Sequence, residues 1–573
     1  MTKLQRELLL KAWKLARAYW FSEEKWWARG MLVVIVALSL AIVAINVWYN
    51  SWHNTFYNAL NERNQTAFIN ALGEFTVLAT CFIIVAVYQI YLNMMLTIRW
   101  RKWMTRQYLG DWLKNQTYYR MKLLDNNNTD NPDQRISEDI NLFVTKSLAL
   151  SIGLFKEVIS LISFIIILWQ LSGVLEIPLG NQVYTISGYL VWAAIGYAVL
   201  GTWLTVKLGR PMVKLNFMQQ RYEADFRFTL MRLRENSESV ALYKGENEEH
   251  SGFLARFQRV FDNYWQLMRL NKKLTWLTSG YSQISIIFAI LVAAPRYFTN
   301  QISLGQVFQI SGAYGNVQSA LSYFVDKFTD LAEWQAVVNR LTEFSTNMEK
   351  VQQWDDNGTE LTVKKAPQDE LAVDNLTVRR PDGTDLLTGL NLQLSPGSSL
   401  LVTGPSGCGK STLLRTLAGI WPFAKGAVKM PENRKVLFLP QKSYLPIGPL
   451  REAVSYPGLT QPVSDQDIKT VLEVCNLSFL ADRLNDSEDW AQVLSLGEQQ
   501  RLAFARVLLQ QPDLVFLDEA TAALDEATES QLYQQIRTKL PSSIIVSVGH
   551  RQTLNKYHTI KLQMDNAGTW QMA

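Results

Sequence analysis

Long apolar stretches dominate the first 340 residues, and each is long enough to cross a bilayer as a helix. From residue 369 onward, short apolar runs of strand length are followed by helical segments instead. This change of pattern predicts an α-helical membrane domain with six transmembrane helices, fused to an α/β domain. The six predicted spans lie near residues 30–49, 75–96, 150–172, 186–206, 276–298 and 304–325.

The sixth apolar stretch is unusually polar. Gln309, Asn316 and Tyr323 recur every seven residues, and Ser319 falls on the same side. Polar groups that face lipid are costly, so this stripe should face the bundle interior or a wet cavity. A hydrophilic pathway is one interpretation, and hydrogen bonding that holds the helices together is the other. Further polar residues occur in the fifth and second spans: Ser279, Tyr281, Ser282, Gln283, Tyr88, Gln89, Tyr91 and Asn93.

The distribution of lysine and arginine predicts the orientation of the spans. The loops 97–147 and 207–273 are rich in both residues, whereas 50–74 carries only Arg63 and 173–185 carries none. Positive loops stay on the cytoplasmic side, so both termini are expected to be cytoplasmic. The net charge of +5 is concentrated in these loops, and nothing in it calls for a nucleic-acid partner.

The predicted domains have the following boundaries. Residues 1–29 form an amphipathic helix lying in the membrane interface, because charged and aromatic residues alternate with leucines before the first span. The membrane domain covers 30–345, and its long cytoplasmic loops are expected to present tips near 128–143 and 219–228. A solvated charged helix is the alternative, above all for 219–228. A polar linker without apolar periodicity covers 346–368, and the α/β domain covers 369–573.

The sequence "GPSGCGKST" matches the full phosphate-loop pattern and stands between an apolar strand and a helical run. Its glycine-rich backbone should cradle phosphates, the lysine should reach the terminal ones, and the serine hydroxyl should take Mg²⁺. The candidate nucleotide ligands are Gly404, Pro405, Ser406, Gly407, Cys408, Gly409, Lys410, Ser411 and Thr412.

Two further motifs follow it. "DLVFLDEATAALD" (513–525) is a strand that ends in two adjacent carboxylates, Asp518 and Glu519. "LSLGEQQRLAFAR" (494–506) begins with the capping-box spacing of Ser495 and Glu498, and a helix N-terminus is an anion site. Phosphoryl transfer needs positioning and charge neutralisation, which a lysine, a metal and backbone amides supply. A solvated strand end is the alternative interpretation of the acidic pair.

Together these motifs resemble the nucleotide-binding domain of an ABC transporter, in the same order along the chain. The resemblance implies binding of ATP and Mg²⁺. It implies catalytic roles for Lys410, for Glu519 as the base that activates water, and for His550 in "VSVGHR" as the switch histidine. The residues implied to associate with the metal are Ser411, Asp518 and Gln441 of "FLPQKSYLP".

The resemblance also implies a homodimer. In this family a signature sequence completes the ATP site of the opposite subunit, so Ser495, Gly497 and Glu498 should meet ATP held by the partner's Lys410. Asp525 matches the loop that couples the two sites.

Two positions depart from the family pattern. Leu496 and Glu498 replace a glycine and a glutamine of the commonest signature. Arg380 stands where an aromatic residue normally stacks on adenine, although a guanidinium can also stack on a base.

Motifs along nearly the whole chain are similar to those of the peroxisomal fatty-acyl-CoA half-transporters and, more closely, the bacterial SbmA/BacA-like transporters with a fused ATPase. They include "RWRKWMT" (99–105), "NPDQRI" (131–136), "ALYKGENEE" (241–249) and "GIWPFAKG" (419–426). The resemblance implies a six-helix, domain-swapped, exporter-type fold in a bacterial inner membrane. It implies ATP-driven transport of a hydrophilic solute, peptide-like or cobalamin-like, with uptake as the expected direction. A lipid or acyl-CoA transporter, an exporter, and a non-transporting ATP-gated sensor or channel are the alternatives.

Overall fold

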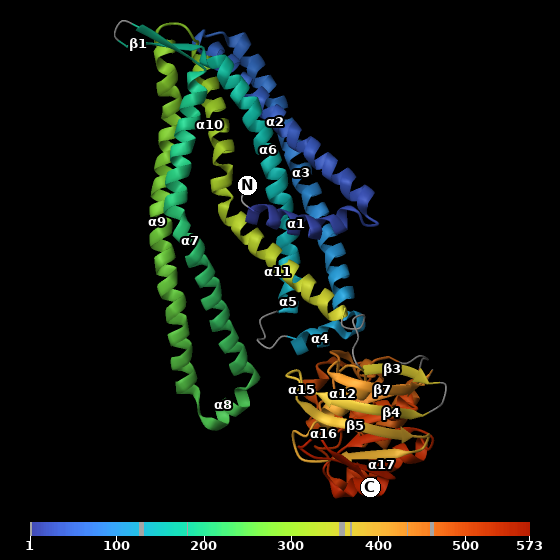
Figure 1. Cartoon of the computed structure of the whole chain (residues 1–573). Coiled ribbons are helices and arrows are strands. Elements are labelled where there is room, and N and C mark those ends of the chain that lie inside the picture. The colour runs from blue at the N-terminus through green and yellow to red at the C-terminus, as the bar shows by residue number, and fades with distance from the viewer. Residues whose placement is uncertain are drawn as a thin grey trace. The chain divides into compact units, whose positions relative to one another are not determined.

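A computed structural model describes residues 3–124, 131–179, 182–353, 361–366, 370–432, 434–458 and 463–573. The chain forms two compact units (Figure 1). Unit 1 comprises Met1–Asp111 and Asp130–Thr346, and unit 2 comprises Trp112–Thr129 and Asn347–Ala573. The division falls inside helix α11 (Phe328–Gln352), so the first residues of the predicted 346–368 linker are helical. Residues 354–360 and 367–368 of that linker lie outside the described part of the chain.

Unit 1 is built from long helices. Among the residues that the structure describes, five segments are long and apolar enough to cross a membrane: Lys25–Asn61, Gln65–Leu123, Pro132–Ser172, Tyr189–Glu235 and Glu246–Phe298. The sixth predicted span forms α10, a helix of 23 residues that is not among these five segments. The long helices of unit 1 include α1 (Lys3–Trp20), α2 (Lys25–Asn61), α3 (Gln65–Leu113), α6 (Ile140–Ser172), α7 (Tyr189–Glu235), α9 (Glu246–Phe298) and α10 (Leu304–Asp326).

Helix α10 packs against α2, α6, α7 and α9. One face, formed by Ile310, Ala313, Tyr314 and Val317, is buried in the apolar core that these helices share. The residues follow the helical spacing i, i+3, i+4 and i+7, which places them on one stripe. At Gly305, any side chain would overlap the carbonyl oxygen of a neighbouring α2 residue, so glycine permits the close approach of the two helices.

Helices α7 and α9 run side by side as a long pair that the short α8 (Ser237–Tyr243) joins (Figure 1). The Asn263 amide of α9 ties the pair together, because it donates to the carbonyl oxygen of Leu215 and to the side chain of Gln219 on α7. Of the two interpretations of 219–228, the charged helix is correct and the tip is wrong. Those residues lie within α7, which continues to Glu235, and the turn comes later, at α8.

The first predicted tip also differs from the structure. From residue 131 to 143 the described chain forms a helical lead-in to α6 within unit 1, where Arg135 and Arg340 both bind the buried Asp139 carboxylate. Residues 112–129 instead group with unit 2, and there Leu123 of α4 (Thr117–Leu124) packs against the apolar core. Residues 125–130 lie outside the described part of the chain.

A β-hairpin that the sequence pattern did not predict links α6 to α7. Its strands are β1 (Val174–Leu179) and β2 (Gln182–Ser187), which pair antiparallel with Leu175 opposite Ile186.

Unit 2 contains two main sheets. The six-stranded sheet has the order β14-β13-β6-β12-β11-β8, with every pairing parallel except that of β13 with β14. The four-stranded sheet has the order β3-β7-β4-β5. The strands are β3 (Leu361–Ala366), β4 (Leu371–Arg379), β5 (Asp385–Leu394), β6 (Ser399–Thr403), β7 (Ala424–Pro431), β8 (Val436–Leu439), β11 (Leu514–Asp518), β12 (Ile544–Val548), β13 (Ile560–Met564) and β14 (Trp570–Met572).

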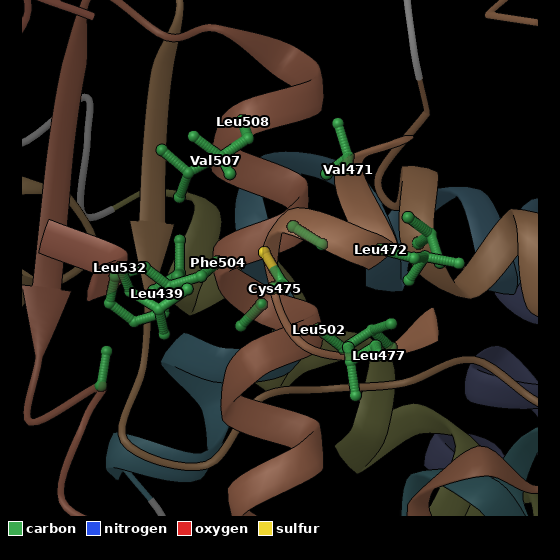
Figure 2. Close-up of a cluster of buried hydrophobic side chains, with 14 of the residues drawn as sticks. Leu439, Val471, Leu472, Cys475, Leu477, Leu502, Phe504, Val507, Leu508 and Leu532 are labelled. Atoms are coloured by element: carbon green, nitrogen blue, oxygen red, sulfur yellow. The ribbon is translucent and has the colours of Figure 1, made fainter. Parts of the chain in front are cut away.

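Strands β6, β11 and β12 are buried along almost their whole length, as expected for a parallel sheet covered on both faces. On one face, α14 (Asp465–Val474), α16 (Leu496–Gln510) and α17 (Glu526–Lys539) enclose an apolar cluster around Phe504 and Leu532 (Figure 2). On the other face, a second cluster fills the space between the two sheets. The helices that carry the motifs are therefore held on a rigid support.

Candidate functional site

The phosphate loop connects the end of β6 to the start of α12 (Lys410–Leu417). Gly404 and Gly409 have φ angles of 150° and 101°, a region that side chains rarely allow. A Cβ at Gly409 would also lie 3.2 Å from the Cβ of Leu386. The buried Lys410 ammonium donates to the carbonyl oxygens of Gly404 (3.0 Å) and Pro405 (2.8 Å), so the lysine is held inside its own loop.

Ser411 and Asp518 meet at the carboxyl ends of the parallel strands. The Ser411 hydroxyl donates to Asp518 Oδ1 at 2.9 Å. Burial raises the pKa of the Asp518 carboxyl, the Ser411 hydrogen bond lowers it, and the charge of Glu519 raises it again. A hydroxyl and a carboxylate are hard oxygen donors of the kind that Mg²⁺ prefers, and such a cation would offset the burial of this charge.

Glu519 lies at the centre of a second group. Its Oε2 accepts a hydrogen bond from Gln441 Nε2 at 3.0 Å, and its Oε1 lies 3.3 Å from His550 Nε2. The backbone of Glu519 has φ 48°, in the left-handed region, and its N–H donates to Val548. A non-glycine residue held in this region costs about 1–3 kcal/mol, and such strain clusters at functional positions. The structure thus brings together three residues that are 31 to 109 positions apart.

The predicted capping box at the start of α16 is confirmed. The Glu498 N–H donates to Ser495 Oγ at 3.4 Å, and the Ser495 N–H donates to Glu498 Oε2 at 2.9 Å. Leu496 points outward, with half of its surface exposed. The space at Gly497 is restricted, since a Cβ there would lie 3.3 Å from the carbonyl oxygen of Ala523.

Two other predicted residues stand apart from the Glu519 group. Asp525 caps α17, where Oδ1 accepts from the Thr528 N–H at 2.8 Å, and this bond lowers the pKa of its carboxyl. Arg380 lies exposed in the turn between β4 and β5, where its N–H donates to the carbonyl oxygen of Thr384.

Cys408 is buried in the apolar core between the sheets. Pro405, Ser406, Gly407 and Thr412 lie in or directly after the phosphate loop.

Three residues next to the site were missed by the motif analysis. Each forms a hydrogen bond with the loop between Glu519 and Asp525: Gln500 with Ala523, Glu529 with Thr521, and Arg551 with Leu524. Their partners lie 8 to 27 residues away, and no sequence spacing signals such bonds. Only the position of Arg551 beside the predicted switch histidine gave a hint.

Comparison with known families and proteins agrees with this geometry. Residues 15–298 match the model of ABC transporter transmembrane region 2, and residues 387–522 match that of ABC transporter. The inner membrane ABC transporter ATP-binding protein YddA of Escherichia coli is 34% identical, over 95% of this chain and 96% of YddA. The human lysosomal cobalamin transporter ABCD4 is 31% identical, over 83% of this chain and 82% of its own.

The fold has a solved counterpart in a bacterial Atm1-family ABC exporter with ATP bound. The TM-score is 0.71 at 16% identity, with 95% of each chain covered. The predicted fold class, a helical membrane domain of exporter type fused to an ABC ATPase domain, is therefore confirmed. The chain belongs to the ABC transporter family, is related to the ABCD half-transporters, and couples ATP hydrolysis to transport.

Proposed function

We propose that two copies of this chain form a transporter that moves a polar solute, peptide-like or cobalamin-like, into a bacterial cell. The observation that carries this proposal is the two-faced character of α10. One face is buried in the apolar core, while Asn316 is half-buried and Ser319 is exposed on the other side. Polar groups are costly in contact with lipid, so this face fits a wet path or the second copy.

Polar side chains of α2 bind the backbone of α10. The Asn50 amide of α2 donates to the Gln309 carbonyl oxygen at 2.9 Å, and the Gly305 N–H donates to Asn58 Oδ1 at 2.9 Å. These bonds match the alternative in which polar groups hold the bundle together. The Asn316 amide, in contrast, donates to Gly312 of its own helix. Asn316 and Ser319 are therefore our candidates for contact with solute.

The relatives support the choice of solute and location. A relative of 31% identity is named a lysosomal cobalamin transporter, and one of 34% identity is named an inner membrane protein. We extend both properties to this chain, with both termini in the cytoplasm as the loop charges predict. We also propose that the chain belongs to the SbmA/BacA-like branch, on the resemblance of its motifs at 99–105 and 131–136.

In the proposed ATP site, Lys410 leaves its loop carbonyls to bind the terminal phosphates. Glu519 accepts the proton of the water that attacks the γ-phosphorus, and His550 orients the same carboxylate and the phosphate. Bound Mg²⁺ would neutralise phosphate charge, held by oxygens of Ser411, Asp518 and Gln441. The ligands expected from the second copy are Ser495, Gly497 and Glu498, with Asp525 between the two sites and Arg380 beside the adenine.

A pocket in unit 1 favours a second candidate, a lipid or acyl-CoA transporter. The pocket has a volume of about 650 Å³, and α7 supplies most of its lining. Its walls are largely apolar, with Trp203 and Val206 among them, and Lys207 and Arg210 lie at one end. An amphipathic anion would fit this combination, because the chain would contact the apolar wall and the head group would meet the cations.

Transport in proteoliposomes of known orientation would test the proposal. Labelled cobalamin and a labelled hydrophilic peptide would be offered to the wild type, to Glu519→Gln and to Asn316→Leu. We expect ATP-dependent movement towards the compartment that holds the ATPase domains, loss of movement in Glu519→Gln, and reduced movement with retained hydrolysis in Asn316→Leu. Hydrolysis without movement of either solute, together with ATP-dependent movement of labelled acyl-CoA, would support the second candidate and overturn the first.

A further inference from the structure

The loop 520–525 follows Glu519 and ends at Asp525. The side chains of Arg551 and Glu529 both form hydrogen bonds with it. Arg551 comes directly after His550. Its guanidinium donates to the carbonyl oxygens of Leu524 (2.7 Å) and Ala522 (3.3 Å). The residue next to His550 therefore holds the loop that begins next to Glu519.

Glu529 of α17 joins the same two segments. Its carboxylate is almost completely buried, with 1% of its surface exposed. It accepts hydrogen bonds from Thr521 Oγ1 at 2.7 Å and Thr553 Oγ1 at 2.6 Å, and Arg551 Nη1 lies 3.5 Å away. A buried charge needs such partners, and all three come from the segments after Glu519 and after His550. Loss of one partner would leave the carboxylate under-compensated.

The helix of the signature sequence holds the loop from the other side. The Ala523 N–H donates to Gln500 Oε1 at 2.9 Å, while Gln500 Nε2 donates to the Gln441 carbonyl oxygen at 3.5 Å. A Cβ at Gly497 would lie 3.3 Å from the Ala523 carbonyl oxygen, so the loop also passes close to the first turn of α16. The loop therefore links the Glu519 group to the first turn of α16.

Gln500 and Glu529, which contact the loop from opposite segments, both lie on helices that pack into the apolar core. Phe504 lies one turn after Gln500, and Leu532 lies three residues after Glu529. Figure 2 shows Phe504 and Leu532 within the apolar cluster. Both side chains are buried in the cluster between α16 and α17. Side chains anchored in this way can define the loop position to within a fraction of an ångström, which is the accuracy that catalytic geometry requires.

We propose that Glu529 and Arg551 are positioning residues for ATP hydrolysis. They fix loop 520–525, and through it both the approach of His550 to Glu519 and the place of the α16 N-terminus that the second copy would use. The proposal rests on the roles that "Proposed function" gives Glu519 and His550. Neither residue is expected to touch the nucleotide, so their loss should lower kcat and leave the binding of ATP nearly unchanged.

The test compares Arg551→Lys and Glu529→Gln with Arg537→Lys as a matched control. Arg537 also lies on α17 and also donates to a backbone carbonyl oxygen, that of Gly397 at 3.0 Å, but it is remote from the loop. The measurements are kcat and KM for ATP, and the unfolding temperature, for the full-length protein in proteoliposomes or detergent. We expect kcat to fall at least tenfold in both loop variants, with KM within about threefold of the wild type, and Arg537→Lys to keep its kcat.

Thr553 keeps the test decisive if a charged variant fails to fold. Thr553→Val removes the hydroxyl that donates to Glu529, and Thr553→Ser retains it, so kcat should fall in the first and recover in the second. Unchanged kcat in Arg551→Lys and Thr553→Val would overturn the proposal. It would also be overturned if the loop variants and the control Arg537→Lys lost kcat to the same extent. Glu519→Gln distinguishes a wrong base assignment from a wrong positioning role. If it still hydrolyses ATP, the assigned base is wrong, whereas its inactivity beside a normal Arg551→Lys would refute the positioning role alone.

Discussion

At the scale of single residues, the site depends on side chains whose environments differ sharply from water. Glu519 occupies a strained backbone conformation and still has two polar side-chain partners. Lys410 is buried against two carbonyl oxygens that a phosphate would replace. Leu496, in contrast, is half exposed and is not part of the buried core. Substitutions at these positions should therefore have very different effects.

Leu496→Gly should leave ATP binding intact and change turnover by less than about threefold. The leucine side chain points outward, while the restricted position next to it, Gly497, is kept. Glycine in the middle of a helix costs about 0.5–1 kcal/mol relative to alanine. Leu496 is the first residue of α16, so the expected fall in stability is smaller than this. Steady-state ATPase assays with a nucleotide-binding titration would check this. Complete loss of activity would show that the leucine itself is required.

A second prediction at this scale concerns His558. Its Nδ1–H donates to the Leu554 carbonyl oxygen and its Nε2 accepts from Ser547, so the neutral ring satisfies both neighbours. Burial lowers the pKa of this imidazole to about 4 from 6.5. The unfolded chain therefore binds more protons between these values, and stability is lost as the pH falls from about 6.5 towards 4.

The loss should amount to at most about 3 kcal/mol, since one pKa unit corresponds to about 1.4 kcal/mol. Unfolding temperatures measured between pH 7.5 and 4.5 would show it, with His558→Gln as the comparison. The variant should start less stable at pH 7.5 and decline less steeply. An equally steep decline in both proteins would assign the pH dependence to other groups.

At the scale of elements, helix starts carry both stability and function. Ser495 caps α16 and Ser464 caps α14 in the same manner, with each hydroxyl accepting from the N–H three residues on. The two caps contribute equally to folding by this argument. Only the α16 start lies in the signature sequence that the second copy is proposed to use.

Ser495→Ala and Ser464→Ala should each lower the free energy of unfolding by about 1 kcal/mol. Turnover should fall strongly in Ser495→Ala alone, because its hydroxyl is assigned to the phosphate of the partner's nucleotide. Thermal unfolding and ATPase assays on both variants would decide this. Equal turnover in the two variants would mean that Ser495 acts as a cap and nothing more.

At the scale of the whole molecule, the chain carries one copy of each motif, so the proposed site needs two chains. Mixed dimers offer a direct test. Pairing Lys410→Ala in one chain with Ser495→Arg in the other places both defects in one composite site and leaves the second site intact. We expect ATPase activity in the mixed dimer that neither homodimer of variants shows.

The control is a dimer in which one chain carries both substitutions and the other is wild type. It has one defect in each composite site, so it should be inactive. Sites built within single chains would give the opposite pattern, with activity in the control and none in the first mixture.

Much of this protein was determined by local sequence. Apolar length predicted the spans, and short-range spacing predicted the phosphate loop, the acidic strand end and the Ser495–Glu498 cap, because each involves neighbours in the chain. Tertiary structure alone decided what joins distant segments. It turned the chain at α8 instead of 219–228, grouped residues 112–129 with unit 2, and joined Glu529 to the segments that follow Glu519 and His550. The physical reason is that such bonds depend on packing in three dimensions, and a buried carboxylate takes its partners from whichever segments the fold brings within reach.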